Sequence, residues 1–424
     1  MKLHKKLILG AAITALAALG LAGCSSGGKA EDKSSGSQTL KVAVWDYKTI
    51  PEFKALFDAF EDKNPGVKIE PVDIPSASYE QKITTMLSGG DKTDVLAMKT
   101  LASYSSYATR NQLVDLSDHI KDLDKEPAQS VYDMYKIDGK TYAQPYRQDF
   151  WVLYYNTKLL KEAGITDVSN MTWDDYVKYA KELTDSSKGI YGSYQHTWRS
   201  VLQATAAGQN DKNILTPPYE YFKPYYERTL ELQKDKAIMD YGTAKSTQVT
   251  YASQFGTEKA AMMPMGTWYM ATVNAAKAKG DATAEWSIAP MPQNEKGEVT
   301  TFGSPTAWAI SKHSANSKLA QKFLDYASGK DGAKVLAKIG VVPAYRTSEI
   351  DDIYFNQKGM PTDEVAKKAF NPDKISLEVP IDAKASEIDQ ALQQEHELIL
   401  TGSESVDKGI DNMNKRVAEI KESD

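Results

Sequence analysis

The sequence predicts an α/β fold divided into two lobes. Apolar periodicity in residues 40–98 follows the order strand, helix, strand, helix, strand, which is typical of parallel α/β layers. A more helical stretch comes next, and strand patterns return at 286–290 and 306–311. Beyond its N-terminal tail, the chain is longer than one hydrophobic core usually holds. These observations indicate two lobes, between which the chain crosses more than once.

The first elements have clear start and stop signals. Residues 40–45 (LKVAVW) alternate as a strand, and Pro51 opens a helix that ends at 64–66 (Asn-Pro-Gly). Ser78 and Gln81 have the spacing of a capping box, which predicts the start of a second helix. Two further strands are expected at residues 67–74 and 94–98.

Loops at the carboxyl ends of parallel strands are available to a ligand. Residues 45–47 and 99–100 occupy such positions and are candidate binding loops. The rest of the chain predicts a hairpin at 138–139, a strand at 150–155, a helix capped by Thr172, helical patterns at 219–236 and 254–263, and a helix from Asn316.

The N-terminus is typical of an exported protein. Three lysines precede an apolar run at 7–19, as in a secretory signal peptide. The run is short for a permanent membrane helix, and LAGC at 21–24 resembles a bacterial lipobox. We therefore expect residues 1–23 to be removed and Cys24 to carry the lipid anchor, a diacylglyceryl group with palmitate. The alternative is an uncleaved signal anchor.

The tail and the composition narrow the class of partner. Residues 24–38 are rich in Ser, Gly and Lys, which predicts a flexible tether. Cys24 is the only cysteine, so the body has no disulfide and no thiolate metal site. The formal net charge is −6, and loss of the three leader lysines makes it −9. This charge disfavours nucleic acid and anionic lipid as partners, so we expect attachment to a membrane only through the N-terminal lipid. We also expect a monomer.

Several separated segments resemble one family, the extracellular solute-binding proteins of carbohydrate ABC importers, whose best-known members bind maltodextrins. The segments lie in family order and span almost the whole body. They are 42–47 (VAVWDY), 51–70 (PEFKALFDAFEDKNPGVKIE), 82–99 (KITTMLSGGDKTDVLAMK), 138–165 (DGKTYAQPYRQDFWVLYYNTKLLKEAGI), 172–184 (TWDDYVKYAKELT), 258–268 (EKAAMMPMGTW), 302–328 (FGSPTAWAISKHSANSKLAQKFLDYAS) and 340–345 (GVVPAY).

The resemblance implies a periplasmic-binding-protein type II fold, in which two lobes close on a ligand through hinge crossovers. It places 39–147 and 287–312 in the N-terminal lobe, and 148–286 and 313–424 in the C-terminal lobe. It implies a binding protein without catalysis or cofactor, which delivers a sugar, an oligosaccharide above all, to the permease subunits of an ABC importer. The expected location is the extracellular face of the cytoplasmic membrane of a Gram-positive bacterium.

A sugar site needs aromatic plates for the C–H face of the ring and polar groups for its hydroxyls. The family positions that commonly meet ligand correspond to Asp46, Asp149 and Trp268. The same mixture of chemistries adds, as further candidates, Trp45, Tyr47, Lys99, Arg147, Trp151, His196, Trp198 and Ser304. Each has a plainer interpretation, because large aromatics are more often core residues and aspartates at strand ends often stabilise turns.

Three other functions stay open on the sequence alone. A secreted glycoside hydrolase would need a pair of carboxylates flanking the scissile bond. A metal-binding lipoprotein would need a ligand cluster, whereas the five histidines are scattered. A binding protein of the same fold could carry a peptide, a polyamine or another solute, although twenty-four tyrosines and seven tryptophans favour a neutral, ring-shaped ligand.

Overall fold

The computed structural model describes residues 38–423. The predicted signal peptide, Cys24 and all of the tether except Gln38 lie outside the described residues, and Gln38 is the first residue of a strand. The described strands are β1 (Gln38–Trp45), β2 (Val67–Ile74), β3 (Val95–Met98), β4 (Lys136–Ile137), β5 (Lys140–Thr141), β6 (Ala143–Asn156), β7 (Tyr191–Ser193), β8 (Ala260–Gly266), β9 (Trp286–Ala289), β10 (Thr300–Ile310) and β11 (Lys374–Leu377).

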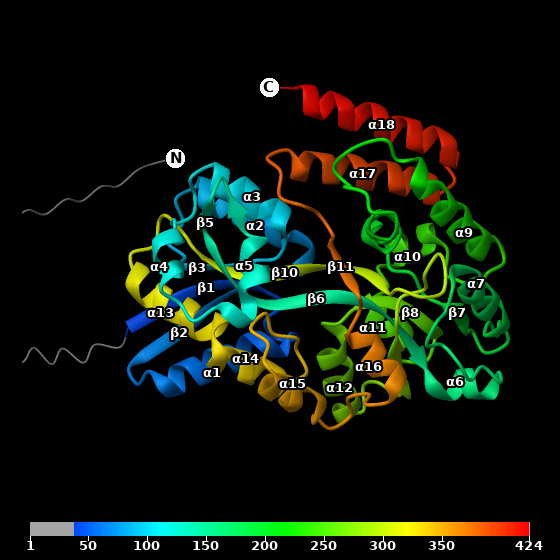
Figure 1. The fold of residues 1–424 in the computed structure, drawn as a ribbon, viewed down its shortest axis with the longest axis horizontal. Coiled ribbons are helices and arrows are strands. Elements are labelled where there is room, and N and C mark those ends of the chain that lie inside the picture. The colour runs from blue at the N-terminus through cyan, green and yellow to red at the C-terminus, as the bar shows by residue number, and fades with distance from the viewer. Residues whose placement is uncertain (1–37, 424) are drawn as a thin grey trace, which may run out of the picture. The chain divides into compact units, whose positions relative to one another are not determined.

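Helices cover these strands and form most of the second half of the chain (Figure 1). In chain order they are α1 (Pro51–Lys63), α2 (Tyr79–Ser88), α3 (Leu101–Thr109), α4 (Ser117–Lys121), α5 (Gln129–Asp133), α6 (Thr157–Glu162), α7 (Trp173–Glu182), α8 (Gln203–Gln209), α9 (Lys223–Lys234), α10 (Tyr241–Thr247), α11 (Tyr251–Phe255), α12 (Tyr269–Lys279), α13 (Ser317–Ser328), α14 (Lys330–Ala337), α15 (Ser348–Phe355), α16 (Glu364–Phe370), α17 (Ala385–Leu400) and α18 (Val406–Glu422). Within residues 38–423, no helix has the length and apolar content needed to span a bilayer.

The predicted parallel α/β layering of the first region is confirmed. Strands β2, β1 and β3 lie side by side and parallel, with α1 and α2 as crossovers. Pro51 opens α1, and Gly66 follows its end with a φ of 91°, a conformation that glycine adopts without strain. The predicted Ser78 capping box is wrong, because the Ser78 hydroxyl donates back to the Pro75 carbonyl, 3.3 Å away.

Two long strands connect the halves of the sheet. Strand β6 pairs with β10 up to Phe150 and with β8 and β9 from Trp151 onward. Strand β10 pairs with β11 at its start and with β3 at its end. Figure 1 shows β6 running from the group of β1 to β3 toward β8 and β7. The resulting order is β2-β1-β3-β10-β6-β8-β7.

The helical pattern predicted at residues 254–263 is wrong in most of its length. Helix α11 ends at Phe255, and β8 begins at Ala260. Strand β8 lies between β6 and β7, so every one of its residues is buried. A strand buried on both faces has no alternation of polar and apolar residues, and its run of alanine and methionine therefore resembles a helix.

Aromatic rings tie later helices to the first strands. Phe323 of α13 lies 5.7 Å from Phe57 and 5.3 Å from Phe60, both on α1, measured between ring centroids. It also lies 5.3 Å from Trp308 of β10. Helix α14 packs against α1 as well. Residues 317–337 therefore share a core with β1 to β3.

Candidate functional site

A buried ionic network lies on β6 where this strand changes partners. Arg147 Nη1 donates to both carboxylate oxygens of Glu52, at 2.5 and 2.6 Å. The Tyr146 hydroxyl donates to Glu52 Oε1 at 2.7 Å. Glu52 stands in the first turn of α1 and is only 2% exposed. These charges can be buried because each of them has a partner of opposite sign.

The same network continues to the loop after β8. Thr267 Oγ1 donates to Asp149 Oδ1 at 2.9 Å. Asp149 Oδ2 lies 2.8 Å from Arg147 Nε, which donates instead to Thr306 Oγ1, so the contact is ionic without a hydrogen bond. Burial raises the pKa of Asp149, and the charge of Arg147 opposes that rise. We call Glu52, Tyr146, Arg147, Asp149 and Thr267 the hinge network.

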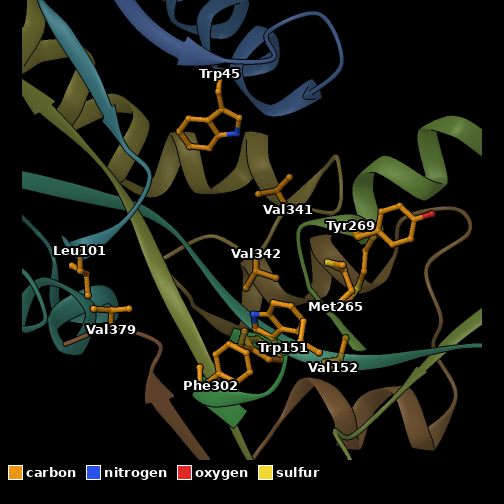
Figure 2. Packing of buried hydrophobic residues seen from close by; sticks show 14 of the residues in the cluster. Trp45, Leu101, Trp151, Val152, Met265, Tyr269, Phe302, Val341, Val342 and Val379 are labelled. Atoms are coloured by element: carbon orange, nitrogen blue, oxygen red, sulfur yellow. The ribbon is translucent and has the colours of Figure 1, made fainter. Parts of the chain in front are cut away.

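Next to Thr267, three tryptophans meet edge to face or tilted. The ring centroid of Trp268 lies 5.7 Å from that of Trp151 and 6.1 Å from that of Trp198. Trp151 is 2% exposed and stacks on Phe302 at 5.0 Å, as Figure 2 shows. Trp198 is 39% exposed. Trp151 is therefore a base on which the two more open indoles lie.

Gly266 is the last residue of β8 and precedes Trp268 by two positions. In the structure, a Cβ at this position would lie 1.9 Å from the indole of Trp268. The glycine therefore makes room for the Trp268 ring itself, which folds back over the end of β8.

His196 and Tyr251 complete the aromatic group. The His196 ring lies 4.4 Å from that of Trp198 and 5.4 Å from that of Tyr251. Burial lowers the pKa of His196 to about 4, so the ring is neutral near pH 7. We call His196, Trp198, Tyr251 and Trp268, with Trp151 beneath them, the aromatic surface.

The candidates on the first strands form a second, polar group. Trp45 is buried, and the Arg147 guanidinium carbon and Lys99 Nζ each lie 5.8 Å from its ring centroid. Lys99 Nζ also donates to the carbonyl and the hydroxyl of Ser76, at 3.0 and 2.8 Å. Figure 2 shows Trp45 separated from Trp151 by Val341 and Val342.

Asp46 and Tyr47 are held by their own loop. Asp46 has a φ of 46°, and its Oδ1 accepts a hydrogen bond from the Ser76 amide at 3.0 Å. The Tyr47 amide donates to Asp73 Oδ1 at 2.9 Å, and its ring stacks on Phe57 at 5.8 Å. These contacts match the plainer interpretation of Asp46 as a turn carboxylate, while both side chains stay partly exposed.

Electrostatics connects the polar group with the aromatic surface. Burial raises the pKa of the Tyr251 phenol, and a hydrogen bond with Trp268 opposes the rise. The charges of Asp46 and Arg147 also act on this phenol, the first raising and the second lowering its pKa. Arg147, whose guanidinium lies over the Trp45 ring, therefore acts on residues of both groups.

Ser304 stands apart from both groups. It lies on β10 opposite Asp149, and its Oγ donates to Glu378 Oε2 at 3.2 Å. Sequence reasoning missed Glu378, Tyr251 and Glu52. Tyr251 follows a Thr250 capping box at the start of a short helix, which is a signal that could have found it. Glu52 and Glu378 carry no local signal, because their partners are distant in sequence.

The described side chains near these groups form no metal centre. No cluster of three His, Cys, Asp or Glu side chains in residues 38–423 could hold a metal ion. A small pocket shares His196 with the aromatic surface. Its lining includes His196 and His396, and His396 Nε2 has no hydrogen-bond partner there.

Comparison with known proteins places this arrangement in a family. The family model described as bacterial extracellular solute-binding protein matches residues 47–334. A putative binding protein of Brucella abortus is 25% identical over 377 residues, which cover 83% of this chain and 86% of that protein. The maltodextrin-binding protein of Bacillus subtilis is 29% identical over 339 residues, or 74% of this chain and 75% of that protein.

A solved structure gives the same answer for the fold. The crystal structure of a sugar transporter from Rhizobium etli, in an open conformation, matches with a TM-score of 0.75 at 34% identity. The match covers 90% of this chain and 99% of that chain. The expected two-lobe fold of the periplasmic binding proteins is therefore confirmed. With the family model spanning well over half of its residues, the chain belongs to the bacterial extracellular solute-binding proteins.

Proposed function

We propose that this protein captures a sugar, in particular an oligosaccharide, between its two lobes and delivers it unaltered to the permease subunits of an ABC importer. The observation that carries the proposal is the aromatic surface, in which Trp198 is 39% exposed beside Trp268. The names of the Bacillus and Rhizobium proteins, which specify maltodextrin and sugar, support the same ligand class.

The chemistry of the two groups fits a pyranose. An indole presents a flat apolar face of the right size for the C–H face of a sugar ring. The polar group adds the Lys99 ammonium, which can donate to a hydroxyl, whereas Asp46 Oδ1 already accepts from the Ser76 amide. His196 stays neutral near pH 7, so the aromatic surface adds no charge that a neutral sugar would have to compensate.

The lobes would move about β6 and β10. Both strands change partners along their length, β6 between Phe150 and Trp151. Two contacts favour a change to the predicted lobe boundaries. The packing of α13 and α14 on α1 favours placing residues 317–337 in the first lobe, and the pairing of β9 with β6 favours placing 286–289 in the second.

We also propose that the mature protein is held at the outer face of the cytoplasmic membrane by a lipid on Cys24. The support is the sequence alone, with its lysines, apolar run and lipobox-like LAGC. Labelled palmitate should enter the wild-type protein in its native host and be absent from Cys24→Ala, which should appear in the medium. A Cys24→Ala protein that stays with the membrane would overturn the anchor.

A screen of ligands tests the function. A ligand that binds only the folded state raises the thermal midpoint, so neutral oligosaccharides should raise it, whereas amino acids, peptides, polyamines and divalent metal ions should not. Stabilisation by amino acids or polyamines but by no sugar would overturn the ligand class. Chromatography of the sugar after prolonged incubation should show no hydrolysis, and turnover would overturn the proposed absence of catalysis.

A further inference from the structure

Glu378 is a partly exposed carboxylate directly after β11, to which neither the sequence nor the family match pointed. It follows β11, whose pairing with β10 places Leu377 opposite Gly303. The Glu378 amide donates to the Gly303 carbonyl at 3.0 Å, and its Oε2 accepts from Ser304 Oγ at 3.2 Å. The side chain is therefore fixed at both its backbone and its carboxylate, while it stays partly exposed.

Arg199, whose positive charge acts on Glu378, forms its ion pair with Asp389 instead. Arg199 Nε lies 2.8 Å from Asp389 Oδ1, to which Nη2 also donates, and Nη1 donates to Gln203 Oε1 at 3.3 Å. Burial raises the pKa of Glu378, and the charge of Arg199 with the hydroxyls of Ser200 and Ser304 lowers it by less. A carboxylate can accept about four hydrogen bonds, so Glu378 keeps acceptor capacity that its neighbours leave unused.

The position of this carboxylate relative to the tryptophans follows from β10. Ser304 and Phe302 are two residues apart and so lie on the same face of the strand. Phe302 stacks on Trp151, and Trp151 meets Trp198 edge to face at 6.4 Å. From the other side, Trp198 is joined through Arg199 to Ser200, which also acts on Glu378. The carboxylate is therefore linked to Trp198 along two paths, one through Phe302 and Trp151 and one through Ser200.

We infer that Glu378 is a specificity-determining group of the binding site, which accepts hydrogen bonds from hydroxyls of the sugar ring lying on Trp198. This inference rests on the proposed function. A group that can only accept hydrogen bonds needs donors on the ligand, and the hydroxyls of a sugar are such donors. A carboxylate on the ligand would be repelled at the same place. The position therefore selects a neutral sugar residue with free hydroxyls and rejects a uronic acid.

Calorimetry on isosteric variants tests this selection. The probes are maltotriose, arabinotriose and diacetylchitobiose as neutral sugars, and trigalacturonic acid as the acidic one. Glu378→Gln keeps the size and the acceptor for Ser304, so its thermal midpoint should stay near that of the wild type. Its affinity for the neutral sugar that the wild type binds best should fall about tenfold, because one charged hydrogen bond is worth roughly that much.

The acidic probe separates recognition from a structural role. Removing the negative charge should raise the affinity for trigalacturonic acid relative to the neutral sugar, which a merely structural glutamate would not change. Glu397→Gln is the matched control, because Glu397 pairs with Lys245 on the exposed side of α17 and should bind like wild type. Wild-type affinity and an unchanged preference in Glu378→Gln overturn the inference alone. A wild type that binds none of the neutral sugars overturns the proposed function as well.

Discussion

The hinge network and the aromatic surface adjoin at Thr267 and Trp268, yet they use their side chains in opposite ways. In the hinge network, the charges of Glu52, Arg147 and Asp149 are buried and engage one another. In the aromatic surface, the rings contact one another but leave Trp198 39% exposed. The charged residues therefore fix the position of the tryptophans, whereas the tryptophans keep exposed surface that is available to a ligand.

The largest expected effect breaks the hinge network. Arg147→Met removes the counter-charge of two buried carboxylates, Glu52 and Asp149, so the free energy of unfolding should fall by about 3–5 kcal/mol. Urea unfolding measures it. The control is Arg346→Met, because Arg346 pairs with Asp351 near the surface and its loss should cost less than about 1 kcal/mol. Equal, small losses in both variants would contradict the description of a buried network.

Binding should depend most on the aromatic surface. Trp268→Ala removes the indole that contacts both Trp151 and Trp198, so sugar affinity should fall about tenfold or more, as for an anchor residue at an interface. Calorimetry measures the dissociation constant. Trp286→Phe, on β9 and against Tyr154, is the control and should bind as wild type does. An unchanged dissociation constant in Trp268→Ala would remove this residue from the site.

Local patterns were sufficient for the first strands and helices. The alternation of residues 40–45 and the proline at 51 depend only on neighbours in sequence, and β1 and α1 follow them. Strand β8 was missed because it is buried on both faces, which erases alternation. The connection of β6 to both halves of the sheet came from the family resemblance, since no periodicity records which strand pairs with which.

The site was predicted unevenly for the same reason. The candidate tryptophans 151, 198 and 268 do come together, whereas their roles as base and open surface depend on burial that one sequence does not display. The pairing of Arg147 with Glu52 joins residues 95 positions apart, so no local sequence motif could predict it. Whether each candidate touches the ligand stays a prediction.

A neutral histidine in the aromatic surface predicts a pH dependence of stability. The pKa of His196 is lowered from 6.5 to about 4 in the folded protein. Between these two pH values the unfolded chain therefore binds a proton at His196 that the folded protein does not bind. Stability is therefore complete above pH 6.5 and falls toward pH 4. His196→Gln should flatten the slope between pH 7 and 5, by at most about 1.4 kcal/mol per pH unit. Identical slopes in urea titrations of both proteins would contradict a neutral, buried ring.

A smaller change tests how Trp268 is held. Gly266→Ala places a methyl where the indole lies, so the ring must move from the backbone of β8. Sugar affinity should fall, but by less than in Trp268→Ala, because the displaced ring is still present. Gly208→Ala, in α8, is a matched control, since its methyl would lie 3.4 Å from Ser376, which is an ordinary contact distance. Full affinity in Gly266→Ala would mean that the folded-back ring position is not needed for binding.

The smallest effect on binding and stability is expected at Asp46, whose side chain is hydrogen-bonded to the neighbouring Ser76 amide. Asp46→Asn keeps an oxygen that can accept from the Ser76 amide, and asparagine tolerates the positive φ of this position. The free energy of unfolding should change by less than about 0.5 kcal/mol, and sugar affinity by less than about twofold. Calorimetry decides between two roles. A tenfold loss with unchanged stability would mean that the second carboxylate oxygen of Asp46 receives a ligand hydroxyl, and the polar group would then share in binding rather than only in positioning.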